Sequence, residues 1–180
     1  DIDTSELASR FAAIVESSDD AIISKTLDGT ILTWNRGAER IFGYTADEVV
    51  GRKLAMLVPP NRTDEVATIL AQVAAGRRVD HFQTVRRRKD GTDIFISVTI
   101  SPVYGANGRI VAASKVARDI TSQTLAAVER DRFFDLSIDM MSSSSKSGDF
   151  VRVNPAFRLH LGYEPGDLVG RALASFVHPS

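Results

Sequence analysis

The segment DGTILTWN, residues 28–35, decides the fold, because a tight turn, a short strand and a helix cap follow one another in it. Its Asp-Gly pair favours the positive φ angles of a hairpin turn between the β-branched runs 21–25 and 30–34. Asn35 is a residue type that caps helices, and Gly43 is a type that ends them. The segment therefore predicts two antiparallel strands followed by a short helix.

Further helix signals lie downstream, and three strand signals follow them. Residues 45–48 have the pattern of a capping box for a helix that stops at Gly51, and apolar residues at i, i+3, i+4 and i+7 predict a longer helix within 61–76. Strands separated by glycine-containing turns are expected over residues 81–88, 92–103 and 109–117. In the middle strand apolar and polar residues alternate, as a half-buried antiparallel strand requires. The order of elements predicts an α+β domain over residues 20–121.

The chain repeats itself at a constant spacing. Asn35 and Asn154 lie 119 residues apart. The same spacing relates further pairs: Gly43 and Gly162, Gly51 and Gly170, Pro60 and Pro179, Asp20 and Asp139, Ser18 and Ser137, and Gly29 and Gly148. A gapless repeat predicts the first half of a second, truncated domain of the same kind over residues 137–180. Its first strand should fall on the serine run 142–145, which lacks strand character. The alternatives for this run are a degraded or mobile edge strand and a segment that another part of the protein stabilises.

Two helices are expected outside these repeated units. Residues 1–19 predict an amphipathic helix whose apolar face holds Leu7, Phe11, Ile14 and Val15. Such a helix must bury its apolar face somewhere, so these residues are predicted to form dimer contacts. Residues 122–136 predict a connector helix that adds Leu125 and Val128 to the dimer contacts. A two-stranded coiled coil and a solvated linker helix are the alternatives for this connector.

Composition limits the chemistry that the chain can perform. The formal net charge of -1 gives no overall attraction to nucleic acid or anionic lipid. The chain has no cysteine, which excludes disulfides, thiolate metal sites and thiol nucleophiles. No apolar run approaches the ~18 residues that span a bilayer. The basic run 86–89 stands where a strand meets a turn, which favours protection of a strand edge over phosphate contacts. His81 has no second ligand at metal spacing. We therefore expect no catalytic residues, metal, nucleic-acid partner or direct membrane contact.

Several segments together resemble the successive signatures of PAS domains: residues 28–35, 38–44, 87–92 and 117–121. The resemblance covers residues 11–121 and, in truncated form, residues 132–180. It implies a five-stranded antiparallel sheet of order 2-1-5-4-3, with short helices on one face around a small cavity. The stretch 113–121 is similar to PAS domains that precede bacterial histidine kinases, and similar stretches also precede diguanylate cyclases.

The resemblance implies two functional regions. Asp119, Ile120 and Thr121 are expected to end the last strand and to pass a signal to the connector helix. The simpler alternative is that Asp119 only caps that helix. The candidate ligand cavity is lined by Ile22, Trp34, Phe42, Leu57, Val66, Leu70, Phe82, Val98 and Ile100. A filled core is the alternative to a cavity.

These features lead to a prediction of function. Haem held by a helix histidine is disfavoured because residues 61–76 contain no histidine, and cysteinyl flavin needs an absent thiol, which leaves non-covalent flavin or a small organic ligand. We predict a homodimeric sensory module that signals to a downstream effector domain in the same parent chain, with a histidine kinase of a two-component phosphorelay as the leading expectation. The alternatives are a ligand-free interaction scaffold and the sensor region of a diguanylate cyclase or phosphodiesterase. The expected location is cytoplasmic, with membrane anchoring of the parent protein left open.

Overall fold

The structure is a computed structural model that describes residues 3–176. The chain divides into two compact units, Asp1–Ser122 and Gln123–Ser180. Pro179, which the repeat pairs with Pro60, lies outside the described residues. None of the helices within residues 3–176 is long and apolar enough to cross a bilayer.

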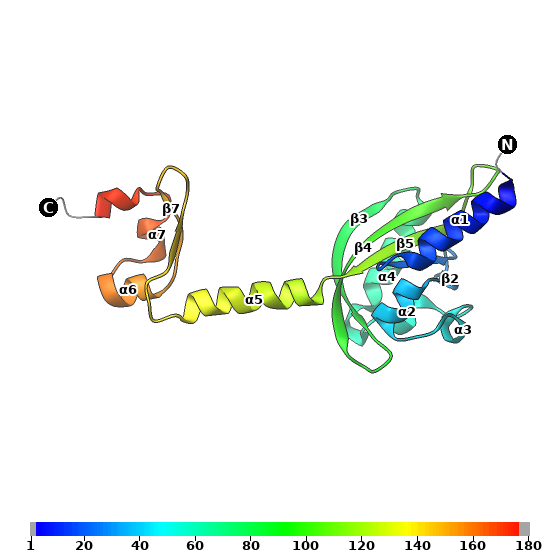
Figure 1. Ribbon diagram of the computed structural model, residues 1–180, viewed down its shortest axis with the longest axis horizontal. Helices are drawn as coiled ribbons and strands as arrows, with labels where there is room; N and C mark the ends of the chain where they lie inside the picture. Colours follow the sequence, from blue (N-terminus) through cyan, green and yellow to red (C-terminus); the bar gives the residue numbers. More distant parts are fainter. Residues whose placement is uncertain (1–2, 177–180) are drawn as a thin grey trace. The chain divides into compact units, whose positions relative to one another are not determined.

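A five-stranded antiparallel sheet forms the centre of the first unit (Figure 1). Its strands are β1 (Ala21–Lys25), β2 (Ile31–Trp34), β3 (Val79–Arg87), β4 (Asp93–Tyr104) and β5 (Ile110–Asp119). They lie in the order β2-β1-β5-β4-β3, which confirms the predicted topology. Gly29, Gly91 and Gly108 have φ values of 85°, 87° and 72° in the three hairpin turns. Glycine adopts these angles without the steric cost that a Cβ atom imposes, so the turns form where the sequence predicts them.

Helical segments precede the sheet and connect its second and third strands. They are α1 (Thr4–Ser17), α2 (Arg36–Phe42), α3 (Ala46–Val49), the 3₁₀ turns η1 (Leu54–Leu57) and η2 (Pro60–Arg62), and α4 (Thr63–Ala74). The side chain of Asn35 accepts the Ala38 N–H at 2.9 Å and caps α2, which ends at the left-handed Gly43. Glu48 accepts the Thr45 N–H at 2.9 Å in the capping box of α3. Helices α2, α3 and α4 cover one face of the sheet (Figure 1).

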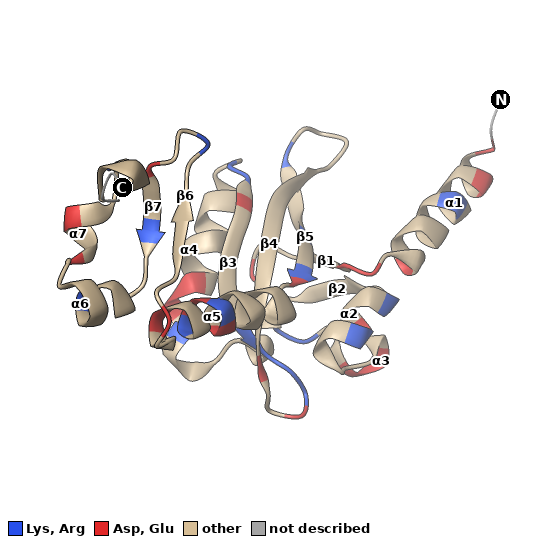
Figure 2. Cartoon of the chain, turned by 60° about the vertical axis from the view of Figure 1, so that its left-hand side comes forward, with Lys and Arg blue, Asp and Glu red and all other residues tan. Residues whose placement is uncertain are grey.

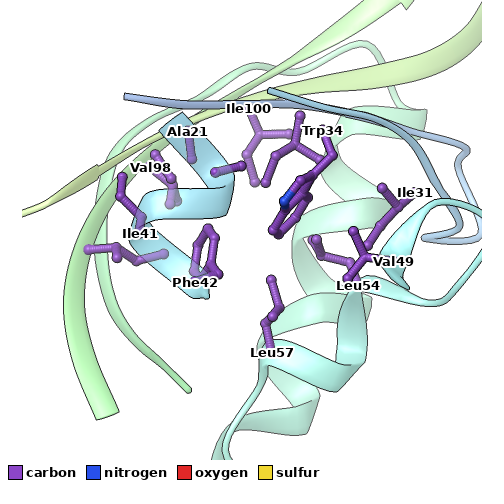
Figure 3. Close-up of a cluster of buried hydrophobic side chains, with 14 of the residues drawn as sticks. Ala21, Ile31, Trp34, Ile41, Phe42, Val49, Leu54, Leu57, Val98 and Ile100 are labelled. Atoms are coloured by element: carbon purple, nitrogen blue, oxygen red, sulfur yellow. The ribbon is translucent and has the colours of Figure 1, made fainter. Parts of the chain in front are cut away.

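The core of the first unit fills the space between these helices and the inner face of the sheet (Figure 3). Every second residue of β4 from Ile94 to Ile100 faces the core, and these residues are all buried: Ile94, Ile96, Val98 and Ile100. The ring centroids of Trp34 and Phe42 lie 5.5 Å apart within this core. Alternation along β4 therefore determines which face of the sheet carries the apolar side chains.

The second unit repeats the opening elements of the first. After α5 (Thr121–Leu136) come β6 (Ser142–Ser144), β7 (Phe150–Val153), α6 (Ala156–Leu161), α7 (Pro165–Leu168) and the 3₁₀ turn η3 (Leu173–Phe176). Phe150, Val153 and Leu168 form a small core of their own. The weak strand propensity of the serine run is overridden, because β6 pairs with β7 in an antiparallel ladder. All three serines of β6 are exposed, so the strand needs backbone pairing rather than apolar side chains.

Candidate functional site

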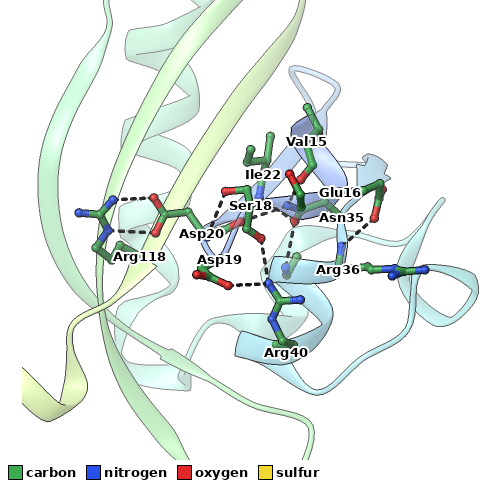
Figure 4. Close-up of polar contacts among 12 residues, drawn as sticks. Val15, Glu16, Ser18, Asp19, Asp20, Ile22, Asn35, Arg36, Arg40 and Arg118 are labelled. Atoms are coloured by element: carbon green, nitrogen blue, oxygen red, sulfur yellow. Dashed lines mark hydrogen bonds and ion pairs between the residues drawn. The ribbon is translucent and has the colours of Figure 1, made fainter. Parts of the chain in front are cut away.

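Asn35 is the centre of a buried polar network that joins three elements of the first unit (Figure 4). Asn35 is only 1% exposed. The Oδ1 atom accepts the N–H groups of Ile22 and Ala38, each at 2.9 Å. The Nδ2 atom donates to the carbonyl oxygens of Val15 at 2.8 Å and Asp20 at 3.1 Å. Asn35 thus links the end of α1, the start of β1 and the first turn of α2.

Asn154 makes the corresponding contacts in the second unit. Its Oδ1 atom accepts the Met141 N–H at 2.9 Å, and its Nδ2 atom donates to the carbonyl oxygens of Ser137 at 3.3 Å and Asp139 at 2.8 Å. Asn154 is fully buried. The repeat seen in the sequence is therefore also a repeat of side-chain function. From sequence Asn35 was predicted only as a helix cap, because the long-range partners of a side chain leave no local pattern.

Ion pairs surround the Asn35 network at the junction between α1 and the sheet (Figure 4). Arg118 on β5 binds both carboxylate oxygens of Asp20, at 2.9 and 2.8 Å. The hydrogen bond from Arg118 is the main reason why the pKa of Asp20 lies below its ordinary value. Arg40 donates to the Ser18 carbonyl oxygen at 2.9 Å and to Asp19 at 3.1 Å. The chain that leaves α1 is thereby attached to both α2 and β5.

The Asp119-Ile120-Thr121 segment connects β5 to α5. Asp119 accepts the Thr121 N–H at 2.9 Å and forms an ion pair with Arg88 at 2.7 Å. The Ile120 N–H donates to the Phe95 carbonyl oxygen at 2.9 Å, and the Phe95 N–H donates to the Thr121 hydroxyl at 3.0 Å. Burial raises the pKa of Asp119, but the hydrogen bonds from Thr121 and the charge of Arg88 outweigh it and leave the pKa low. The carboxylate therefore caps the helix and also ties the helix start to the β3–β4 hairpin.

The predicted cavity lining falls into two groups. Most of its members lie together in the core or pack against it: Trp34, Phe42, Leu57, Phe82, Val98 and Ile100. Ile22, Val66 and Leu70 are half-buried and do not belong to this core cluster. Ile22 alternates with two buried neighbours in β1 and belongs to the other face of the sheet. Helix α4 presents Ile69 and Val73 to the core in place of Val66 and Leu70.

Three cationic side chains were missed by the sequence interpretation, although they belong to the inner face of the sheet. Lys25 on β1 and Lys115 on β5 are each 2% exposed, and Arg86 on β3 is 4% exposed. Arg86 is paired, since it binds Glu65 of α4 at 3.1 Å and the Thr84 hydroxyl at 2.9 Å. Alternation was the available signal, because Lys25 follows Ala21 and Ile23, and Lys115 lies between Ala113 and Ala117. Because lysine is usually exposed, this alternation was not taken to place Lys25 and Lys115 on the buried face.

The basic run 86–89 is neutralised by carboxylates around the β3–β4 turn, where both signs of charge lie together (Figure 2). Its ion pairs are Arg86–Glu65, Arg87–Asp93, Arg88–Asp119 and Lys89–Glu48. Arg86 departs from the prediction of edge protection, because its side chain turns inward. An open hollow of about 360 Å³ beside the turn is lined by Arg40, Phe42, Gly43, Arg88, Lys89 and Asp90.

The predicted dimer residues lie on the surface of their helices. Leu7, Phe11 and Ile14 of α1 are 41%, 59% and 64% exposed, while Val15 is half-buried. Leu125 and Val128 of α5 are exposed, and no residue of α5 is buried. Within residues 3–176 no group of three or more histidine, aspartate or glutamate side chains is arranged to hold a metal ion. Three of the four predicted residues of α1 and both predicted residues of α5 are therefore available for contact with another molecule.

Comparison with known proteins agrees with this geometry. The family described as PAS fold matches residues 9–120, and a PAS domain family matches residues 138–180. Two-component system protein A of Emericella nidulans is 34% identical over 107 residues, which cover 58% of this chain and 15% of that protein. The blue-light-activated histidine kinase of Brucella ovis is 31% identical over 130 residues, which cover 70% of this chain and 26% of that protein. The chain thus spans about a quarter or less of the length of these relatives.

A solved structure is similar over nearly its whole length. The PAS domain of a Colwellia psychrerythraea protein is 28% identical, with a TM-score of 0.60, and the match covers 64% of this chain and 98% of that one. It shares the architecture built above from the hairpin glycines, the capped short helices and the β2-β1-β5-β4-β3 sheet. The family match over residues 9–120 covers more than half of the chain. This chain therefore belongs to the PAS family.

Proposed function

We propose that this chain is the sensory and dimerisation region of a two-component histidine kinase. The domain boundaries we propose are an N-terminal helix over 1–19, a PAS domain over 20–121, a connector over 122–136 and the first half of a second PAS domain over 137–180. A signal sensed by the first PAS domain would pass through α5 to an effector domain in the same parent chain. The names of the two relatives, a two-component system protein and a histidine kinase, support this kind of effector.

The observation that carries the proposal is the direct connection between β5 and α5. Asp119 belongs to the last strand and also accepts the first N–H of the helix, at 2.9 Å. Its second carboxylate oxygen binds Arg88, which directly follows β3, the strand at the edge of the sheet. A displacement of the sheet therefore reaches the helix start through two polar contacts instead of through a flexible loop. Such a contact set is suited to a two-state element.

Asp119→Asn should change the output of the full-length parent protein. The amide retains an acceptor for the Thr121 N–H but loses the charge that binds Arg88 at 2.7 Å. Coupling between sites is typically worth about 1–3 kcal/mol, so we expect phosphorylation of histidine from labelled ATP to change by about fivefold or more. The direction of the change reports whether the ion pair favours the active or the inactive state.

Asp93→Asn is the matched control, because it removes the neighbouring exposed ion pair with Arg87. That pair does not touch α5, so its loss should leave the phosphorylation rate within about twofold of the wild type. Equal effects of Asp119→Asn and Asp93→Asn would contradict the role of Asp119 in output. A full-length protein that incorporates no phosphate on histidine would contradict the kinase assignment itself.

Dimerisation is proposed to use the apolar face of α1 against the same face of a second copy. Leu7→Asp or Phe11→Asp places a charge where an apolar contact is proposed, and both positions are exposed in the single chain. We expect each substitution to weaken self-association by about tenfold or more, because burying an unpaired carboxylate is costly. Sedimentation velocity over a range of protein concentrations measures this change.

Ser9→Asp provides the control for dimerisation, since Ser9 is exposed on α1 and lies on the side opposite Leu7. It introduces the same charge and should leave the association constant nearly unchanged. A chain that remains monomeric at high concentration, or one whose association is equally affected by Ser9→Asp and Phe11→Asp, would contradict a dimer built on this face.

A further inference from the structure

Lys25 and Lys115 are placed on the inner face of the first sheet by the pairing of β1 with β5. In this ladder Lys25 is paired with Ala113, and Ile23 is paired with Lys115. Ile23, Lys25 and Lys115 are all buried, so the two lysines are diagonal neighbours on one face. Diagonal positions of an antiparallel pair lie about 7 to 8 Å apart, which is within reach of long side chains. The two ammonium groups are therefore in the same part of the interior.

Neither ammonium group has an acidic partner. Within residues 3–176 the side chains of Lys25 and Lys115 form no ion pair with a carboxylate, and neither Nζ atom is among the fully enclosed atoms that lack a partner. The carboxylate of Glu65 on α4 is already bound by Arg86, Arg62 and the Thr84 hydroxyl. The Nζ atom of Lys115 instead lies 5.6 Å from the centroid of the Phe42 ring. Arg86 and Arg62 share the single carboxylate of Glu65, so no carboxylate charge is left to balance the two lysines when they are protonated.

The energetics of this arrangement favour either loss of protons or binding of an anion. Burial, together with repulsion from the charge of Arg86, lowers the pKa of Lys25 to about 8. Burial also places the pKa of Lys115 well below its ordinary value, with added repulsion from Lys25 and Arg86. Buried charges in proteins are normally paired or bind ligands, and aliphatic side chains would fill the same space without this cost. Two adjacent unpaired lysines therefore indicate a binding role.

We propose that the inner face of the first PAS sheet binds the carboxylate or phosphate group of a small anionic ligand through Lys25 and Lys115. Lys25 comes from β1 and Lys115 from β5, while Arg86 from β3 lies on the same face and is paired with Glu65. The side chain of Phe42 on α2 points into the core (Figure 3). The Nζ atom of Lys115 lies over the Phe42 ring. This proposal rests on the proposed sensory function, because it names the chemical class of signal that the domain receives.

The test is calorimetric titration of the complete 180-residue chain with sodium phosphate, sodium acetate and sodium succinate at constant ionic strength. Sodium chloride serves as the blank. We expect one binding site for at least one of these anions, and comparison of phosphate with the two carboxylates identifies the source of the charge. Binding should also take up protons, because an anion favours the protonated lysines. Proton uptake is measured by repeating the titration in buffers of different ionisation enthalpy.

Lys25→Met and Lys115→Met each replace an ammonium group by an apolar chain of similar length. We expect either substitution to weaken anion binding by about tenfold or more and to reduce the proton uptake. Lys146→Met removes an exposed lysine of the second unit and should change neither quantity. Far-UV circular dichroism verifies that each variant is folded, and Lys25→Met tests the site independently if Lys115→Met does not fold.

Two results would overturn the proposal. One is the absence of binding heat for phosphate, acetate and succinate beyond the chloride blank. The other is an affinity that is the same in Lys25→Met, Lys115→Met and the wild type. If no anion binds but Asp119→Asn still changes phosphorylation, only the ligand assignment is wrong. If an anion binds but Asp119→Asn has no effect on phosphorylation, the proposed output function is wrong and the ligand site remains.

Discussion

Asn35→Ala is expected to reduce the free energy of unfolding of the first unit by about 4 kcal/mol, because the loss of a buried hydrogen-bond centre leaves several backbone groups unpaired. Two N–H groups lose their acceptor and two carbonyl oxygens lose a donor. No water replaces these contacts easily at a residue that is 1% exposed. For a domain of this size, such a change lowers the melting temperature by more than about 10 °C.

Chemical denaturation of the whole chain measures this effect, with Asn154→Ala as the partner experiment. Asn154 has the corresponding role in the second unit, so its substitution should destabilise that unit and leave the first unit's transition in place. Asn61→Ala removes an exposed asparagine and should change stability by less than about 0.5 kcal/mol. A loss below about 1 kcal/mol for Asn35→Ala would show that the network is not essential for the fold.

Lys25→Met is expected to stabilise the first unit near neutral pH by about 3 kcal/mol. The pKa of Lys25 falls from an ordinary value of 10.5 to about 8 in the folded state. Each pH unit between these values corresponds to about 1.4 kcal/mol of unfolding free energy. Below about pH 8 both states hold the proton and the full cost of burying the charge is present. Replacement by an apolar chain removes that cost.

The sign of the pH dependence follows from proton counts. Between about pH 8 and 10.5 the unfolded state binds more protons at Lys25 than the folded state, so wild-type stability rises with pH in this window. The advantage of Lys25→Met should therefore shrink as the pH approaches 10.5. The charged groups that act on Lys25 are Arg86 on β3 and Lys115 on β5, and Arg86 is in turn paired with Glu65 on α4.

Urea unfolding of the wild type and Lys25→Met at several pH values, in buffers free of phosphate and carboxylates, measures the difference. Lys146→Met should show no comparable pH-dependent difference, because Lys146 is exposed. A constant stability gap between wild type and Lys25→Met across this pH range would mean that Lys25 keeps its ordinary pKa. That result would also remove the energetic reason for an anion at this face.

Local patterns in the chain were sufficient to predict most of the fold. The hairpin turns at Gly29, Gly91 and Gly108 formed as expected, since the conformational preference of glycine is a property of the residue itself. The alternation in β4 correctly separated its buried face from its exposed face. The constant spacing of Asn35 and Asn154 and of the other repeated pairs is enough to indicate the repeat from the sequence. Each of these signals depends on residues that are close in sequence or on exact repetition.

The tertiary structure decided which side chains meet. Periodicity placed an apolar stripe on α4, but its rotation against the sheet selected Ile69 and Val73. Gly37 carried no local signal, yet a Cβ atom there would lie 2.2 Å from the Asp20 carbonyl oxygen, so the close approach of α2 to the start of β1 requires glycine. The inward direction of Lys25 and Lys115 depends on the pairing of β1 with a strand that comes much later in the chain. Burial, partners and charge balance are set by such long-range packing, which neither propensity nor spacing encodes.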